Sequence, residues 1–229
     1  MRGQWKFLLV AGLLALGCAA PASAGYDDDV ETCLDHKADH DAAIGACTRM
    51  IAVGKAKDLD TAYNNRGVSL AAKDDHDAAI ADFTQAIRLN GRNFLHYRNR
   101  GDSLQSKGQE DRAIVDYDQA IRLNPKDAIN FNNRGYSYFE KNDYARAIAD
   151  YSRAIALDPK DPIFFRNRAD AYGSGDNPDY AKAIADYDRA IRMDATDPQA
   201  FNSRGLAFHS KGDYDRAIAD FDRAIRLKP

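Results

Sequence analysis

The chain has 229 residues and carries 32 Lys and Arg against 35 Asp and Glu, which gives a formal net charge of −3. This mild acidity argues against nucleic acid or an anionic membrane surface as the main partner. The sequence contains no glycine-rich phosphate loop, no Gly-x-Ser-x-Gly elbow and no paired-histidine zinc motif. We therefore expect no enzymatic activity and no cofactor.

Residues 1–24 are expected to be a cleaved export signal. Arg2 and Lys6 give this segment a positively charged start, an apolar run follows, and Ala22-Ser23-Ala24 has the small residues of a cleavage site. The apolar run is too short to span a bilayer stably. The mature chain is predicted to begin at Gly25, to have a net charge of −5 (30 basic against 35 acidic residues), and to be periplasmic or secreted.

An alternative for the same segment is a lipoprotein signal. Residues 15–18 read Ala-Leu-Gly-Cys and loosely resemble a bacterial lipoprotein box, which would make Cys18 a lipidated N-terminus. The usual pattern prefers a larger aliphatic residue where Ala15 stands, and the site after Ala24 is the cleaner one. A lipid anchor at Cys18 therefore stays open as a second possibility.

A repeated phrase dominates the rest of the chain. An Asn-Arg-Gly motif or a close variant begins at residues 65, 99, 133, 167 and 203, at steps of 34, 34, 34 and 36 residues. An echo of Ala-Ile-Ala-Asp-Tyr follows each motif, beginning at residues 79, 113, 147, 183 and 217. A fixed period in this range is typical of a stacked repeat array rather than of a globule with one active site.

Within one unit the pattern predicts a pair of helices. Residues 128–159 form two amphipathic stretches, which are interrupted at residues 141–143 and ended by Pro159. Apolar residues three, four and seven positions apart place each set on one helical face. The small residues Gly135 and Ala147 are expected where the two helices approach closely. Each unit should therefore be an antiparallel helix pair.

The period, with Gly or Ala at position eight, Ala at twenty, an aromatic residue at twenty-four and Ala at twenty-seven, resembles the tetratricopeptide repeat (TPR). Five units are expected at 60–93, 94–127, 128–161, 162–197 and 198–229, the fourth with two extra residues in its turn. The resemblance implies an all-α, right-handed superhelical solenoid of antiparallel helix pairs. It also implies a scaffold that binds a protein or peptide in a concave groove lined by the first helix of each pair.

Residues 25–59 are expected to form a degenerate, capping helix pair. Residues 41–51 align with the second helix of the later units, and a first helix is expected at about 28–38. Cys33 and Cys47 would then lie on paired helices, and an exported chain favours a disulfide between them. A metal- or redox-responsive module is the alternative, with Cys33, His36, His40 and Cys47 as ligands.

Opposite charges recur at two positions of every unit, where many tetratricopeptide repeats carry apolar or aromatic residues. Position seven is Arg and position twenty-three is Asp in all five units. Bidentate pairing of the two side chains is expected, and the strict recurrence favours a structural ladder over a charged ligand site. The expected pairs are Arg66–Asp82, Arg100–Asp116, Arg134–Asp150, Arg168–Asp186 and Arg204–Asp220.

The groove implied by the resemblance would be polar and rich in amides. A row of carboxamides can hold the main chain of an extended peptide, because each offers both a donor and an acceptor. The alternative is that these amides only bond between adjacent units. The expected binding residues at positions five, six and nine are Asn64, Asn65, Arg98, Asn99, Asn132, Asn133, Tyr136, Arg166, Asn167 and Asn202.

The last unit ends without a following polar helix in this sequence. Because each pair in such a stack buries its face against the next, residues 205–229 are expected to self-associate or to dock a partner helix. The function predicted from sequence is that of an exported scaffold without catalysis. The alternatives are an envelope lipoprotein adaptor tethered through Cys18 and the module built on Cys33 and Cys47.

Overall fold

The computed structural model describes residues 22–35, 39–54 and 57–228, and every regular element in them is an α-helix. Cys18 and all but the last three residues of the predicted export signal therefore lie outside the described residues. The twelve helices are α1 (Ala22–Leu34), α2 (His40–Val53), α3 (Leu59–Ala72), α4 (His76–Leu89), α5 (Phe94–Ser106), α6 (Glu110–Leu123), α7 (Ala128–Glu140), α8 (Tyr144–Leu157), α9 (Pro162–Tyr172), α10 (Tyr180–Met193), α11 (Pro198–Ser210) and α12 (Tyr214–Leu227).

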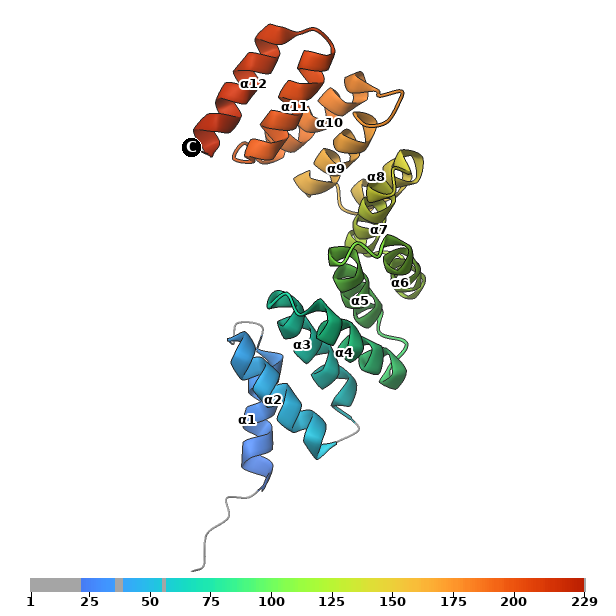
Figure 1. The fold of residues 1–229 in the computed structure, drawn as a ribbon, viewed down its shortest axis with the longest axis vertical. Helices are drawn as coiled ribbons and strands as arrows, with labels where there is room; N and C mark the ends of the chain where they lie inside the picture. Colours follow the sequence, from blue (N-terminus) through green and yellow to red (C-terminus); the bar gives the residue numbers. More distant parts are fainter. Residues whose placement is uncertain (1–21, 36–38, 55–56, 229) are drawn as a thin grey trace, which may run out of the picture.

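The helices form six antiparallel pairs that stack into a superhelical solenoid (Figure 1). The second helix of each pair packs against the first helix of the next pair, and first helices also contact one another along the stack. As Figure 1 shows, α1 and α12 lie at opposite ends of the array. Each unit expected from the sequence at 60–229 contains one such pair. No helix among the described residues is long and apolar enough to cross a bilayer.

Aspartates and prolines set the helix ends. The side chain of Asp143 accepts a hydrogen bond from the backbone N–H of Arg146 and caps α8, and Asp161 and Asp197 cap α9 and α11 in the same way. Pro stands in the first turn of α9 and of α11, where a missing N–H costs nothing. The turn between α9 and α10 spans residues 173–179, whereas the other turns within units 60–229 have three residues.

A close approach of glycine to an aromatic ring joins the two helices of most pairs. A Cβ added at Gly135 would lie 2.9 Å from the ring of Tyr151, and one added at Gly67 would lie 2.7 Å from the ring of Phe83. Tyr151 and Phe83 are buried. The glycine at position eight of the unit is therefore a packing residue, because no side chain fits between its helix and the ring.

The first pair differs from the sequence-based prediction in its boundaries. Its first helix is Ala22–Leu34 instead of about 28–38, and His40 begins α2. Asp39 caps α2 by accepting a hydrogen bond from the backbone N–H of Ala42. Residues 36–38 are outside the described residues. The spacing of the tetratricopeptide repeat could not predict these boundaries, because the apolar residues of α1 do not follow the pattern of the later first helices.

Candidate functional site

The first helices of successive pairs lie side by side and form one continuous surface. We call the side chains at positions five, six and nine of each unit the groove face. Position six contributes a row of amides, and each of its four asparagines donates one hydrogen bond to the preceding unit. The bonds are Asn65 to Cys33 O (3.0 Å), Asn99 to Asn64 Oδ1 (2.9 Å), Asn133 to Asp102 Oδ1 (2.8 Å) and Asn167 to Asn132 Oδ1 (2.8 Å).

This arrangement decides how much of the amide row is available to a ligand. Each Asn side chain has two N–H donors, and one of them is already used between units. Asn65 and Asn133 also accept a hydrogen bond from the residue before them, Asn64 and Asn132. The row therefore ties neighbouring units together, and only its remaining donors and acceptors can contact a bound segment.

Position nine alternates between acidic and apolar side chains. Asp102 accepts from the hydroxyl of Tyr117 at 2.8 Å, and Asp170 accepts from the hydroxyl of Tyr187 at 2.5 Å. Burial raises the pKa of both carboxyls, and the tyrosine hydrogen bonds offset part of that shift. The apolar members of the position are well exposed, and they are Val68 (41%), Tyr136 (42%) and Leu206 (54%).

Two arginines repeat the same alternation at position five. Arg98 donates to Asp127, the residue that caps α7, at 3.1 Å, and Arg166 donates to Asp197, the residue that caps α11, at 2.7 Å. Both guanidinium groups use Nη1 for this bond. The groove face thus has a period of two units, because the second and fourth units carry Arg and Asp where the others carry amides and apolar residues.

The two acids open onto small cavities between units. A cavity of about 200 Å³ is lined by Asp102 together with His76 and Ser106, and one of about 280 Å³ is lined by Asp170 together with Ser174 and Ser210. Each lies between the first helices of two neighbouring pairs and the second helix of the earlier pair. Such cavities are large enough for a single side chain and too small for a drug-sized ligand.

The five Arg–Asp pairs expected within units are bidentate in the structure. In each pair Arg Nε lies 2.7–2.8 Å from Asp Oδ2, and Nη2 lies 2.6–2.9 Å from Oδ1. The carboxylate raises the pKa of Arg134, so the guanidinium stays charged. Burial raises the pKa of Asp150, and the bonds from Arg134 offset part of that shift. None of these pairs faces the groove cavities, which favours a structural role.

The same arginines also reach across to the preceding unit, which the sequence did not reveal. Each Nη1 donates to the side chain at position twenty-five of the unit before it, at 2.6–3.1 Å. These contacts are Arg66 to Thr48, Arg100 to Thr84, Arg134 to Asp118, Arg168 to Ser152 and Arg204 to Asp188. Each arginine therefore fixes both the angle within a pair and the stacking of pairs.

Cys33 and Cys47 replace the glycine and the aromatic residue of the later pairs. The two residues are joined as a disulfide in the structure, and their Cα atoms lie 5.0 Å apart, within the range for such a bond. The link thus crosses between helices where other pairs have a ring against a glycine. The described residues contain no group of three or more His, Cys, Asp or Glu side chains that could hold a metal ion. His36, named in the metal alternative, lies outside them.

Comparisons with known proteins bear on the family. Profiles described as TPR repeat and Tetratricopeptide repeat match residues 61–93, 101–140, 135–174 and 170–229. The chain is a tetratricopeptide-repeat protein. None of the curated proteins compared with the sequence matches it.

Solved tetratricopeptide-repeat structures share the fold. A crystal structure of MamA is 25% identical, with a TM-score of 0.64 over 71% of this chain and 94% of that one. MamA 41-end from Desulfovibrio magneticus RS-1 is 18% identical, with a TM-score of 0.68 over 76% of this chain and 96% of that one. YrrB, described as a TPR protein with an unusual peptide-binding site, is 19% identical, with a TM-score of 0.63 over 80% and 93%. The architecture is thus that of a protein-interaction scaffold.

Two buried polar side chains of this tetratricopeptide-repeat protein escaped the sequence reasoning. His96 is 1% exposed, and its ring nitrogens lie 3.1 Å from Asn64 Oδ1 and 3.3 Å from Asp60 Oδ2. Burial lowers its pKa, and the hydrogen bond with Asp60 offsets part of the shift. Asn130, at the same position of the next unit, is fully buried and has no hydrogen-bond partner among the described residues. Position three is small or aromatic in the other units, so only a comparison between units could have singled them out.

Proposed function

We propose that this protein is an exported scaffold that holds an extended polypeptide segment along its groove face. The observation that carries the proposal is the two-unit period of that face. Exposed apolar side chains at Val68, Tyr136 and Leu206 alternate with acid-lined cavities at Asp102 and Asp170. An extended segment with apolar and donor-bearing side chains at matching intervals fits such a surface.

The spacing defines the segment further. Packed helix axes lie about 8–10 Å apart, so two units along the groove span roughly 18 Å. An extended chain advances about 3.3 Å per residue, which places about five or six residues between equivalent sites. The proposed ligand has apolar residues at that interval, with a Lys, Arg or other hydrogen-bond donor near the middle of each interval to reach Asp102 or Asp170.

Two further observations support binding at this face. The amide row keeps one N–H of each Asn for a ligand, so main-chain carbonyls can be held without reading side chains. YrrB, whose fold this chain shares, is described as having a peptide-binding site. Groove binding of a polypeptide is the use of a tetratricopeptide array that this surface chemistry fits best.

Photocrosslinking tests the proposal directly. We place p-benzoylphenylalanine at Tyr136, which is 42% exposed on the groove face, and irradiate living cells. Val115 is the matched control, because it is 62% exposed on the second helix α6 and away from the groove face. We expect defined covalent adducts from position 136 and none from position 115. Equal adduct patterns at both positions would contradict groove binding.

We also propose export with cleavage before Gly25, and a disulfide between Cys33 and Cys47 in the mature protein. The support is the composition of residues 1–24 and the placement of the two cysteines on facing helices. Intact-mass analysis of the native protein should give a chain that begins at Gly25. A mature chain that begins at a diacylated Cys18 would replace this proposal by the lipoprotein adaptor.

A further inference from the structure

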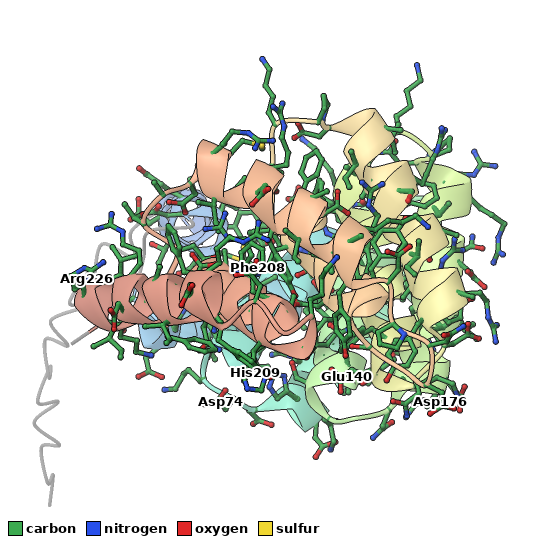
Figure 2. The ribbon with its side chains drawn as sticks, turned by 90° about the horizontal axis from the view of Figure 1, so that it is seen from above. Asp74, Glu140, Asp176, Phe208, His209 and Arg226 are labelled. Atoms are coloured by element: carbon green, nitrogen blue, oxygen red, sulfur yellow. A yellow bond between two sulfur atoms is a disulfide. The ribbon has the colours of Figure 1, made fainter. Side chains whose placement is uncertain are left out.

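Every second helix but α12 is covered on its outer face by the first helix of the next pair. Among the described residues, no helix covers the outer face of α12. Tyr214, Ile218 and Ile225 are 59%, 58% and 65% exposed. The counterparts of Ile218 and Ile225 in α6 are Ile114 and Ile121. They are partly buried because α7 packs over them. Figure 2, which looks along the array from its C-terminal end, shows α12 lying in front.

The sequence of α12 nearly duplicates that of α6. Ten of the fourteen residues are identical, and among them is a pair of acids seven positions apart, Asp111 and Asp118 in α6 and Asp215 and Asp222 in α12. The helix that covers α6 is part of this structure. The contacts between α6 and α7 therefore show what a helix needs in order to cover α12.

Helix α7 meets the two acids of α6 with two cations. Arg134 Nη1 lies 2.6 Å from Asp118 Oδ1, and the ammonium group of Lys141, at the end of α7, lies 2.5 Å from Asp111 Oδ1. Three residues before the arginine, Phe131 belongs to the same apolar cluster as Ile121. The covering helix thus presents an aromatic residue, then Arg three positions later, then Lys seven positions after that.

Parts of this contact recur at other interfaces of the array. Arg204 meets Asp188 in the same way, and Lys73 and Lys107 pair with Asp41 and Asp77. No described residue donates a hydrogen bond or an ion pair to either Asp215 or Asp222 of α12. A cavity of about 450 Å³ lies beside Ala224 and Ile225, at the place that corresponds to Phe131 on α6.

We infer that the outer face of α12 docks an amphipathic helix of a partner protein that carries the pattern aromatic-x-x-Arg-x-x-x-x-x-x-Lys. The arginine pairs with Asp222, the lysine pairs with Asp215, and the aromatic ring enters the cavity beside Ile225. The cavity adjoins the end of the groove face, because Arg166, Asp170 and Asn202 also line it. Asp215 and Asp222 lie on the second helix and are not part of the groove face, so the inference rests on other residues than the groove-binding proposal does.

A second copy of this chain does not match the surface. Its first helix, α1, has Asp29 and Thr32 at the positions where the aromatic residue and the arginine are required. Head-to-tail stacking would therefore leave Asp222 of one copy opposite Thr32 of the next, without a cation to pair with it. The charge pattern thus argues against a second copy as the occupant.

The probe is a fluorescein-labelled peptide of residues 127–141, stapled as a helix through positions 132 and 136, which face the groove in the array. Binding to the purified full-length protein is followed by fluorescence anisotropy. We expect saturable binding, and we expect Asp222→Asn in the protein to weaken it about fivefold or more because a charge-assisted bond is lost. Asp176→Asn, the same change in the turn between α9 and α10 (labelled in Figure 2), serves as the matched control and should leave the affinity unchanged.

A charge swap separates docking from nonspecific attraction. The Asp222→Arg protein should lose the peptide and should recover binding when the peptide carries Arg134→Asp. Absence of saturable binding, or equal weakening by Asp222→Asn and Asp176→Asn, would overturn the inference. Sedimentation velocity of the protein alone gives the third readout. A monomer is expected, and a dimer that Asp222→Asn abolishes would assign the face to a second copy and overturn the proposed occupant.

Discussion

Removing Arg134 should destabilise the array at its centre, and the structure lets the cost be worked out. In Arg134→Met the aliphatic stem is kept but the guanidinium is lost, together with two bonds to Asp150 and one to Asp118. The side chain of Asp150 is 9% exposed, so its charge is left without a partner in a nearly dry site. Asp118 is 36% exposed and is solvated easily.

The magnitude follows from these two environments. Stranding a fully buried charge costs about 3–5 kcal/mol, and the exposed contact to Asp118 contributes less than about 1 kcal/mol. Arg134 itself is 20% exposed, so water can reach the vacated site and lower the cost. We expect a loss of about 2–4 kcal/mol in the free energy of unfolding. Arg112→Met removes an exposed arginine of α6 that bonds only to Gln109, and it should change stability by no more than about 0.5 kcal/mol.

A double variant shows whether the cost comes from the stranded charge. Arg134→Met with Asp150→Leu leaves no unpaired charge at the buried site, so much of the lost stability should return. The assay is urea unfolding followed by circular dichroism, with hydrogen exchange of α7 and α8 as a local readout, because repeat arrays need not unfold in one step. A double variant as unstable as the sum of the two single variants would refute the reasoning.

The remaining predictions concern other contacts of the array. Replacing both Cys33 and Cys47 by Ala should lower the local free energy of unfolding of α1 and α2 by about 3 kcal/mol, as expected for a closed loop of about 15 residues. Hydrogen exchange of these two helices measures the loss. Two free thiols in the native exported protein would contradict the bond. Gly135→Ala should cost about 1–3 kcal/mol because its Cβ overlaps a buried ring. Gly45→Ala in α2 should be neutral or stabilising in thermal melts, because its Cβ would meet only the flexible end of the Arg49 side chain, at 3.4 Å. Asn133→Ala should lower stability by about 1 kcal/mol because a half-buried carboxylate loses a donor; unchanged unfolding in urea would contradict a structural role for this hydrogen bond.

Most of the fold could be read from the sequence, because its determinants lie within single units. The period of the Asn-Arg-Gly motif predicted five helix pairs in residues 60–229, the structure has five pairs there, and profiles of the repeat family match residues 61–93 and 101–229. The Arg134–Asp150 pairing was also legible. Both residues belong to one helix hairpin, whose geometry is fixed by local helix periodicity and a three-residue turn.

Contacts between units were decided only by the tertiary structure. The bond from Arg134 to Asp118, the donation from Asn133 to Asp102 and the cavity beside Asp170 all depend on the angle at which one pair stacks on the next. That angle results from packing over the whole interface, and no spacing in the sequence encodes it. The start of α1 was misplaced for a related reason: a disulfide between Cys33 and Cys47 stands where other pairs have a glycine and a ring, so the first pair carries no repeat signal to align.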